Sequence, residues 1–225
     1  MFTKENKFLK SLTPQERILF CYKLYNKSVS FITGLGPSGI CILYYLNQLK
    51  INVPIYFVDT GYNFNETLEL KVKLEDYFHI EIKVLQANQL LRDYVSKGSN
   101  QSPCTINPNL CCHILKVTPI LEVLPNKKAW FSGLRKSQSA LRSKIETINL
   151  DGRGTVKVCP VFDWSYDDVK SFISKHDLPY NPLLDLGYKS VGCKDVTTKS
   201  LVADSCERSG RWYNSDQTEC GINVF

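Results

Sequence analysis

The sequence lacks three features that would place the protein in other classes. No apolar stretch approaches the length of a membrane span, and residues 1–20 alternate charged with apolar side chains, unlike a signal peptide. No run of five or more basic residues is present, so nucleic acid is not a favoured partner. We therefore expect a cytoplasmic protein that has no membrane partner and no nucleic-acid partner.

Internal repeats and low-complexity segments are also lacking, and the composition is that of an ordinary globular chain. In 225 residues, 43% are hydrophobic and 22% are charged. The net charge of +6 is compatible with an anionic ligand, although a basic solvent-facing surface is the commoner reason for such a value. The sequence leaves the oligomeric state open, with a homo-oligomer among the alternatives.

Segments typical of strands alternate with segments of helical length. Continuous apolar runs predict strands that are buried on both faces. The alternation predicts an α/β fold with a mostly parallel twisted sheet. The predicted strands lie at 29–33, 54–61, 80–85, 129–135 and 155–164.

The segments outside this core divide the chain without making a second domain. Residues 1–27 are interpreted as an N-terminal helical extension, 28–178 as the α/β domain and 179–225 as a mobile tail that covers the substrate. Within the α/β domain, the polar residues 98–110 predict a loop. The helix predicted after that loop contains Pro119, which is expected to break or bend it.

Three of the predicted strands end in polar or glycine-bearing segments. Ligands of parallel α/β sheets bind beyond the C-terminal strand ends, so these segments are expected to meet at one edge. The first, TGLGPSG, offers backbone N–H groups and a helix N-terminus, which suit an anion, although an ordinary strand–helix turn is the alternative. It is neither a Walker motif nor the usual dinucleotide fingerprint. The three segments are Thr33–Gly36, Asp59–Gly61 and Ser132–Arg135.

The segment GLRKSQSALR brings three cations together directly after a predicted strand. Arginine side chains match the oxygens of phosphate and sulfate groups. The placement favours an anion site over a solvated helix face. The cations are Arg135, Lys136 and Arg142, and Gln138 and Ser139 are further donors.

Nine cysteines are present, and this odd number in a chain without a predicted export signal argues against a disulfide framework. Cys21, Cys41 and Cys159 lie in apolar runs and are interpreted as core residues. The adjacent pair Cys111 and Cys112 is different, because two vicinal thiolates can bind an iron–sulfur cluster or a soft metal.

Five segments resemble the assimilatory adenylyl-sulfate and phosphoadenylyl-sulfate reductases, and they occur in that family's order. They are YFVDTGYNFNET, CCHILKVTPI, WFSGLRKSQSALR, ERSGRWY and ECGI. The similarity runs from about Ser28 to Ile222, which is nearly the whole chain. It implies an adenine nucleotide α-hydrolase-like (Rossmann-like) fold, in agreement with the predicted alternation of strands and helices.

The resemblance also implies a reaction. The thiolate of Cys220, next to Glu219 in the Glu-Cys-Gly motif, would attack the sulfur of adenylyl sulfate or 3′-phosphoadenylyl sulfate. AMP or adenosine 3′,5′-bisphosphate would leave, and a separate thioredoxin or glutaredoxin would release sulfite from the S-sulfocysteine. Nearby cations would help by lowering the pKa of the thiol.

Two sets of residues would hold the substrate according to this resemblance. One forms the nucleotide loop and the surroundings of the adenine, and the other supplies cations and donors to the phosphosulfate. The first set is Thr33, Gly34, Gly36, Asp59, Thr60 and Gly61. The second set is Lys116, Arg135, Lys136, Gln138, Ser139, Arg142, Arg208 and Arg211.

The sequence departs from cluster-bearing members of the family, which have a Cys-Cys pair and a later Gly-Cys-x-x-Cys-Thr. Here the later stretch is VGCKDVTT, so Val196 stands where the last cysteine is expected. A four-iron cluster takes four thiolates, and only Cys111, Cys112 and Cys193 match. We therefore expect no intact [4Fe-4S] cluster and no required cofactor.

Several alternatives stay open at this stage. Cys206 or Cys104 could substitute as the fourth ligand, or the thiols could bind zinc or form a disulfide. In the family the cluster accompanies the unphosphorylated nucleotide, so the choice of substrate is open as well. An ATP-using adenylyltransferase of the same fold lacks support, because TGLGPSG has no Lys-Asp-Ser. A non-catalytic metal- or redox-sensing relative is the other alternative.

Overall fold

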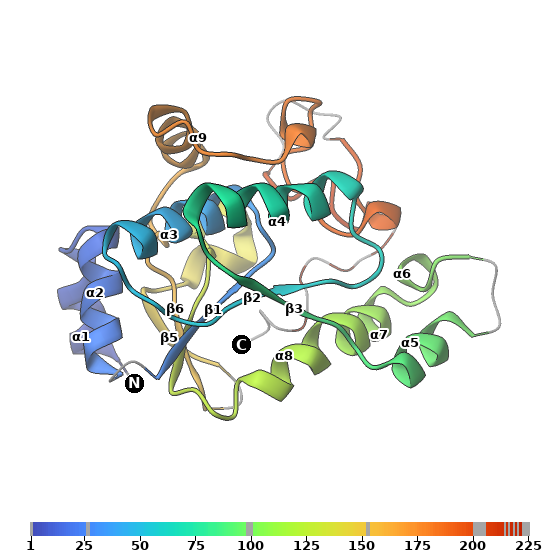
Figure 1. Cartoon of the computed structure of the whole chain (residues 1–225), viewed down its shortest axis with the longest axis horizontal. Coiled ribbons are helices and arrows are strands. Elements are labelled where there is room, and N and C mark those ends of the chain that lie inside the picture. The colour runs from blue at the N-terminus through green and yellow to red at the C-terminus, as the bar shows by residue number, and fades with distance from the viewer. Residues whose placement is uncertain are drawn as a thin grey trace.

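The structure is a computed structural model that describes residues 2–25, 28–97, 101–151, 154–199 and 206–213, and residues 215, 217, 219 and 221. Among these residues, six strands form one sheet in the order β3-β2-β1-β4-β6-β5, in which β5 runs antiparallel to β6 and the other pairs are parallel (Figure 1). The predicted α/β fold with a mostly parallel sheet is confirmed. The strands are β1 (Val29–Thr33), β2 (Ile55–Val58), β3 (Ile82–Leu85), β4 (Ala129–Phe131), β5 (Ile148–Leu150) and β6 (Val156–Val158).

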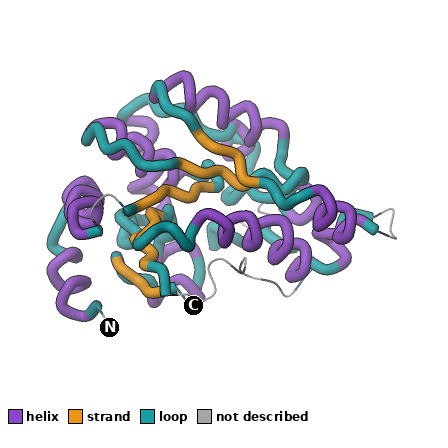
Figure 2. Tube along the Cα trace, turned by 60° about the horizontal axis from the view of Figure 1, so that its bottom comes forward, coloured by secondary structure: helices purple, strands orange, loops and turns teal. Residues whose placement is uncertain are grey.

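Helices cover both faces of this sheet, which is the middle of three layers (Figures 1 and 2). One face carries α3, α4 and α9, and the other carries α5 to α8, while α1 and α2 lie at one end. The α-helices are α1 (Thr3–Lys10), α2 (Pro14–Leu24), α3 (Pro37–Gln48), α4 (Asn65–Phe78), α5 (Gln89–Ser96), α6 (Pro103–Ile106), α7 (Pro108–Cys112), α8 (Thr118–Val123) and α9 (Tyr166–Lys175). A π-helix (His113–Val117) joins α7 to α8, and 3₁₀ turns lie at Lys136–Gln138, Ala140–Lys144, Pro182–Leu184 and Lys194–Val196.

Prolines begin helices here where the sequence predicted a loop and a break. Pro103 and Pro108 stand in the first turns of α6 and α7, so most of the predicted loop is helical. Pro119 likewise stands in the first turn of α8 and does not interrupt the chain of helices. The π-helix before it carries a wider bond, from the Thr118 N–H to the His113 carbonyl, which continues the helical path past the proline.

Two elements, β5 and α5, were not predicted from the sequence. β5 is a three-residue edge strand, too short for a clear alternating pattern. Its outer edge is paired by a side chain, because Asn6 Nδ2 donates to the Ile148 carbonyl and the Ile148 N–H donates to Asn6 Oδ1, both at 2.8 Å. None of the residues of α5 is buried, and only Leu91 and Val95 of this eight-residue helix pack against the core, while two other apolar side chains are exposed, so the side that faces the core is small.

The buried apolar side chains form two main clusters, one on each side of the sheet. The larger contains the apolar faces of α3 and α4 with β1, β2 and β6. The smaller joins the π-helix and α7 to Trp130 of β4, and it contains four cysteines. In the part of the chain that the structure describes, no helix has the length and apolar character needed to cross a bilayer.

A buried arginine attaches the N-terminal helices to the sheet domain. Thr13 and Glu16 form the capping box that begins α2, and these hydrogen bonds lower the pKa of Glu16. One residue later, Arg17 is 2% exposed. Its guanidinium donates to the carbonyls of Leu9 and Pro160 at 2.9 and 2.8 Å, and to both carboxylate oxygens of Asp163 at 2.7 Å. This side chain therefore ties α1 and α2 to the segment after β6.

We expect Arg17→Met to lower the free energy of unfolding by about 3 kcal/mol, because it leaves buried carbonyl groups without donors. The measurement is urea unfolding followed by circular dichroism. Lys10→Met is the matched control, since Lys10 is largely exposed and pairs with Glu146 at the surface, and it should change the stability by less than about 1 kcal/mol. Equal effects of the two substitutions would contradict the anchoring role of Arg17.

Candidate active site

A cavity of about 280 Å³ lies at the C-terminal edge of the parallel strands. Its walls come from the turn after β1, the end of β2, the segment after β4, the π-helix and the C-terminal segment. Two of the three strand-end segments predicted to meet at one edge do line it, namely Thr33–Gly36 and Ser132–Arg135. Ligands of parallel α/β sheets bind in this location.

The turn between β1 and the first residues of α3 is tightly packed around Gly39, whereas a Cβ on Gly34 or Gly36 would meet open space. Leu35 has a left-handed φ of 56°, and its N–H is held by Thr33 Oγ1 at 3.0 Å. A Cβ on Gly39 would lie 2.5 Å from Thr33 Oγ1, and one on Gly133 would lie 3.0 Å from the Gly39 nitrogen. Gly133 thus lets the segment after β4 approach the start of α3, and Gly39 leaves room for Thr33.

The first turn of α3 faces the cavity. Gly36, Pro37 and Ser38 all line it, so the start of a twelve-residue helix borders the cavity. A helix N-terminus favours negative charge through its backbone N–H groups and the helix dipole. This end of the cavity suits an anionic group.

Cationic side chains gather around the rest of the cavity. Six of them line it, contributed by the π-helix, the segment after β4, and two separate stretches beyond α9. They are Lys116, Arg135, Arg142, Lys189, Arg208 and Arg211. Their shared sign suits an anionic ligand.

Arg135 is bound on all sides by protein groups. It is 2% exposed, and its Nε donates to Ser38 Oγ at 2.7 Å. Its Nη1 donates to Ser137 Oγ at 2.7 Å and to the Trp164 carbonyl at 3.2 Å. Its Nη2 pairs with the carboxylate of Glu207. Arg135 therefore links α3, the 3₁₀ turn and the C-terminal segment.

Arg142 makes a two-pronged ion pair with Glu219. The Nε and Nη2 groups donate to the two carboxylate oxygens of Glu219, each at 2.6 Å, and Nη1 donates to Gln138 Oε1. The side chains are 6% and 9% exposed, respectively. Arg208 Nη2 lies 3.5 Å from the same carboxylate. The residue that the sequence motif places next to the thiol is thus held by two of the cationic residues.

The C-terminal segment positions Arg208 and Arg211 against one aromatic ring. Trp212 is 2% exposed, and its N–H donates to the Val196 carbonyl at 2.7 Å. The guanidinium carbons of Arg208 and Arg211 lie 5.3 and 4.7 Å from the centre of the Trp212 ring. A Cβ on Gly192 would lie 2.1 Å from the Arg211 guanidinium.

The sequence interpretation missed several residues of this wall. Gly192 leaves room for the Arg211 guanidinium in its present position, and its place next to Cys193 in the VGC stretch was the available signal. Glu207 had a signal as well, since it precedes the two arginines of ERSGRWY. The other missed residues of the cavity wall include Ser38, Asn63, Thr67, Trp130, Tyr166 and Lys189.

Some predicted site residues lie elsewhere. Asp59 is occupied by its own turn, since its carboxylate accepts from the Gly61 N–H at 2.9 Å and from Gln86 Nε2 at 2.7 Å. Thr60 contacts Cys193, with 3.5 Å between Oγ1 and Sγ. None of Asp59, Thr60, Gly61, Lys136 and Ser139 is among the described residues that line the cavity.

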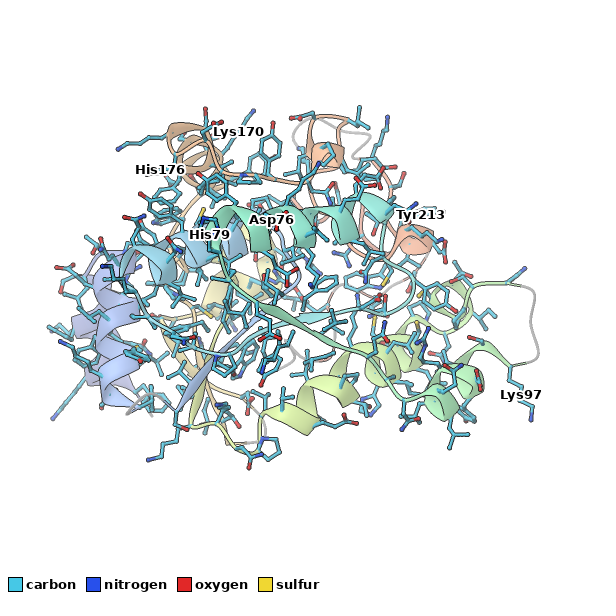
Figure 3. All side chains as sticks on the ribbon, viewed as in Figure 1. Asp76, His79, Lys97, Lys170, His176 and Tyr213 are labelled. Atoms are coloured by element: carbon cyan, nitrogen blue, oxygen red, sulfur yellow. The ribbon has the colours of Figure 1, made fainter. Side chains whose placement is uncertain are left out.

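Lys136 points toward Glu146 and the Phe162 ring, at 3.9 and 5.0 Å. The predicted nucleophile Cys220 lies outside the described residues. Figure 3 places Tyr213 near the start of α4, whereas Asp76 and His79 lie toward its other end. The C-terminal segment thus reaches the same edge of the sheet as the cavity.

Four buried cysteines pack in one apolar cluster with residues of the π-helix. Cys104 and Cys111 have their sulfur atoms 3.0 Å apart, and both are at most 3% exposed. The contact with Cys111 raises the pKa of Cys104 to about 12, and the contact with Cys104, together with burial, raises that of Cys193 to about 12. Cys112 accepts a hydrogen bond from Gln217 Nε2 at 3.5 Å.

The departure from the family's four-cysteine pattern lies at Val196. Val196 is 7% exposed and packs in the same apolar cluster as Cys193, where it offers no ligand atom. Of the two substitutes considered, Cys104 contacts Cys111, whereas Cys206 is exposed. Over the described ranges, no group of three or more His, Cys, Asp or Glu side chains is arranged to hold a metal ion.

Comparison with known proteins agrees with the motifs. Residues 28–199 match the family model described as phosphoadenosine phosphosulfate reductase domain. Proteins named adenosine 5′-phosphosulfate reductase from Bacillus cereus (strain AH187) and Bacillus thuringiensis subsp. konkukian (strain 97-27) are each 37% identical over 205 residues, which cover 91% of this chain and 87% of the relative.

Solved structures show the same fold. The phosphoadenylyl-sulfate reductase from Candida auris, solved as a phosphate complex, superposes with a TM-score of 0.76 at 27% identity, covering 86% of this chain and 94% of that one. The FMN adenylyltransferase of Candida glabrata has a TM-score of 0.62 at 14% identity, covering 95% and 73%. Because the adenylyltransferase is only 14% identical to this chain, its similarity shows the fold alone.

We expect Gly192→Ala to weaken anion binding roughly tenfold or more, because the new methyl group displaces the Arg211 guanidinium and removes a charged hydrogen-bond donor from the cavity. The measurement is titration calorimetry with inorganic sulfate. Lys194→Ala is the control, since it removes an exposed cation nearby without touching Arg211. If Gly192→Ala binds sulfate as the parent protein does, Arg211 is not an anion ligand.

Proposed function

The chain belongs to the phosphoadenosine phosphosulfate reductase family, and from that premise we propose that it reduces a nucleotide-bound sulfate to sulfite with electrons from a thioredoxin-type dithiol. The family supports an oxidoreductase of sulfate assimilation that binds an adenine nucleotide. A cytoplasmic location suits the reaction, because dithiol reductants are kept reduced there.

The proposed chemistry is a transfer between sulfur atoms. The thiolate of Cys220 bonds to the sulfonate sulfur, and the bond from that sulfur to the phosphate oxygen breaks, so that the nucleotide leaves with the electron pair. A thiolate of the reductant then attacks the cysteine sulfur of the S-sulfocysteine, and sulfite leaves. The second thiol of the reductant resolves the mixed disulfide, so the dithiol becomes a disulfide as sulfate sulfur is reduced to sulfite.

The observation that best supports this proposal is the position of the residue before Cys220. Glu219 is bound by Arg142 at the wall of the cationic cavity, and Gly221 lies against Val117, since a Cβ there would be 3.3 Å from Val117 Cγ2. The residues on either side of the thiol are thus attached to the cavity and the π-helix. The start of α3 and the cations Lys116, Arg208 and Arg211 would hold the phosphosulfate.

Adenylyl sulfate is the substrate we favour. Relatives that are 37% identical are named for adenosine 5′-phosphosulfate, whereas the Candida auris enzyme named for phosphoadenylyl sulfate is 27% identical. Sulfite release should therefore be measured with both nucleotides on the same sample. Pyrophosphate release from ATP would instead support an adenylyltransferase, and no sulfite from either nucleotide would support the redox-sensing alternative.

In the family the cluster accompanies the unphosphorylated nucleotide, but we further propose that this chain works on adenylyl sulfate without an intact four-iron cluster, because Val196 cannot ligate iron. Protein purified without oxygen should contain iron well below the stoichiometric amount and lack an absorption band near roughly 400 nm. Brown, iron-loaded protein would overturn this. Cys104→Ala and Cys206→Ala would then show which thiol is the fourth ligand.

Cys220→Ser should lower the rate of sulfite release by more than roughly 1000-fold, because a serine hydroxyl does not replace the thiolate nucleophile. The affinity for AMP should change little, since the substitution hardly alters the size of the side chain. Cys206→Ser is the control, as Cys206 is the exposed cysteine of the described segment. Retained activity in Cys220→Ser would disprove the assignment of the nucleophile.

A further inference from the structure

Two arginines that the sequence assigns to a substrate anion bind glutamate side chains of the C-terminal segment instead. Arg135 pairs with Glu207, and Arg142 pairs with Glu219. Both arginines come from the segment after β4, and both glutamates come from the segment beyond residue 205. The earlier arginine binds the earlier glutamate and the later arginine binds the later one, so two ion pairs join these segments.

The Arg142–Glu219 pair leaves little capacity for another anion. All three guanidinium nitrogens of Arg142 donate, two of them to Glu219 and one to Gln138. Both carboxylate oxygens of Glu219 accept, and both side chains are at most 9% exposed. A buried pair of this kind is costly to open, because each charge would be left without a partner. An incoming sulfate would have to displace a carboxylate that already has the best geometry.

Residues of the same segment also contact the end of α7 and the π-helix. Gln217 Nε2 donates to the Glu219 carbonyl at 3.0 Å and to Cys112 Sγ at 3.5 Å, so one amide joins the segment to the end of α7. Gly221 packs on Val117 of the π-helix. Gln217, Glu219 and Gly221 therefore contact both the 3₁₀ turn that carries Arg142 and the helical stretch that carries Lys116.

We propose that Glu219 is a positioning residue and Arg142 its receptor, and that this pair docks the thiol-bearing C-terminal segment over the cavity. The inference rests on the proposed function and assigns Arg142 to the chain rather than to the substrate. Arg208, 3.5 Å from the Glu219 carboxylate, connects the docked segment to the cations that face the substrate anion. Binding of that anion and docking of the segment then support each other.

The first test separates docking from substrate binding. Glu219→Gln should lower kcat roughly tenfold or more, because a neutral amide cannot replace the buried carboxylate, while KM for adenylyl sulfate stays within about twofold. Arg142→Glu combined with Glu219→Arg should recover part of kcat, whereas either change alone should not. Glu146→Gln is the control, because Glu146 pairs with the exposed Lys10 at the surface.

The second test does not depend on activity. Hydrogen exchange of the peptide that contains residues 206–221 should be slow in the parent protein and roughly tenfold faster in Glu219→Gln, with the sheet unchanged. Two results would overturn the inference: unchanged exchange, or tighter binding of adenylyl sulfate by Glu219→Gln with kcat retained, which would make Glu219 a competitor of the substrate. Altered exchange without sulfite release from any form would refute the proposed function and leave the docking role intact.

Discussion

The concentration of positive charge at the C-terminal edge of the sheet is the constraint on which the rest of the site depends. Six Lys and Arg side chains line one cavity of about 280 Å³, and like charges repel more strongly next to a protein interior than in water. Carboxylates of Glu207 and Glu219 offset part of this charge. A nucleotide with adjoining phosphate and sulfate groups is the kind of ligand that offsets the remainder.

Close packing of the backbone brings these charged side chains together. Gly133 allows the segment after β4 to approach the start of α3, so that Arg135 reaches Ser38. On the other wall, the π-helix carries Lys116 into the cavity while Cys111 and Cys112, just before it, remain buried. The thiols of Cys111 and Cys112 and the cation Lys116 thus share one helical stretch but face different surroundings, because the two thiols lie in an apolar cluster.

The sequence predicted at which edge of the sheet the cavity lies, but it did not predict which residue each side chain contacts. TGLGPSG and the segment that contains Arg135 and Arg142 were predicted to meet, and they do. The predicted neighbour Asp59 is absent from the cavity wall, because its carboxylate closes its own turn. Gly192 escaped notice, because its importance comes from a guanidinium nineteen positions later in the chain, Arg211.

The sequence by itself determined the alternation of strands and helices, the glycine turn after β1 and the motifs that identify the family, because all of these depend on residues that are close together in the chain. It also determined that Val196 cannot be an iron ligand. Tertiary structure alone decided that Arg142 binds Glu219 and that Cys104, rather than the exposed Cys206, contacts Cys111. The physical reason is that burial selects the partner of each charge and each thiol, and burial arises only when distant segments pack together.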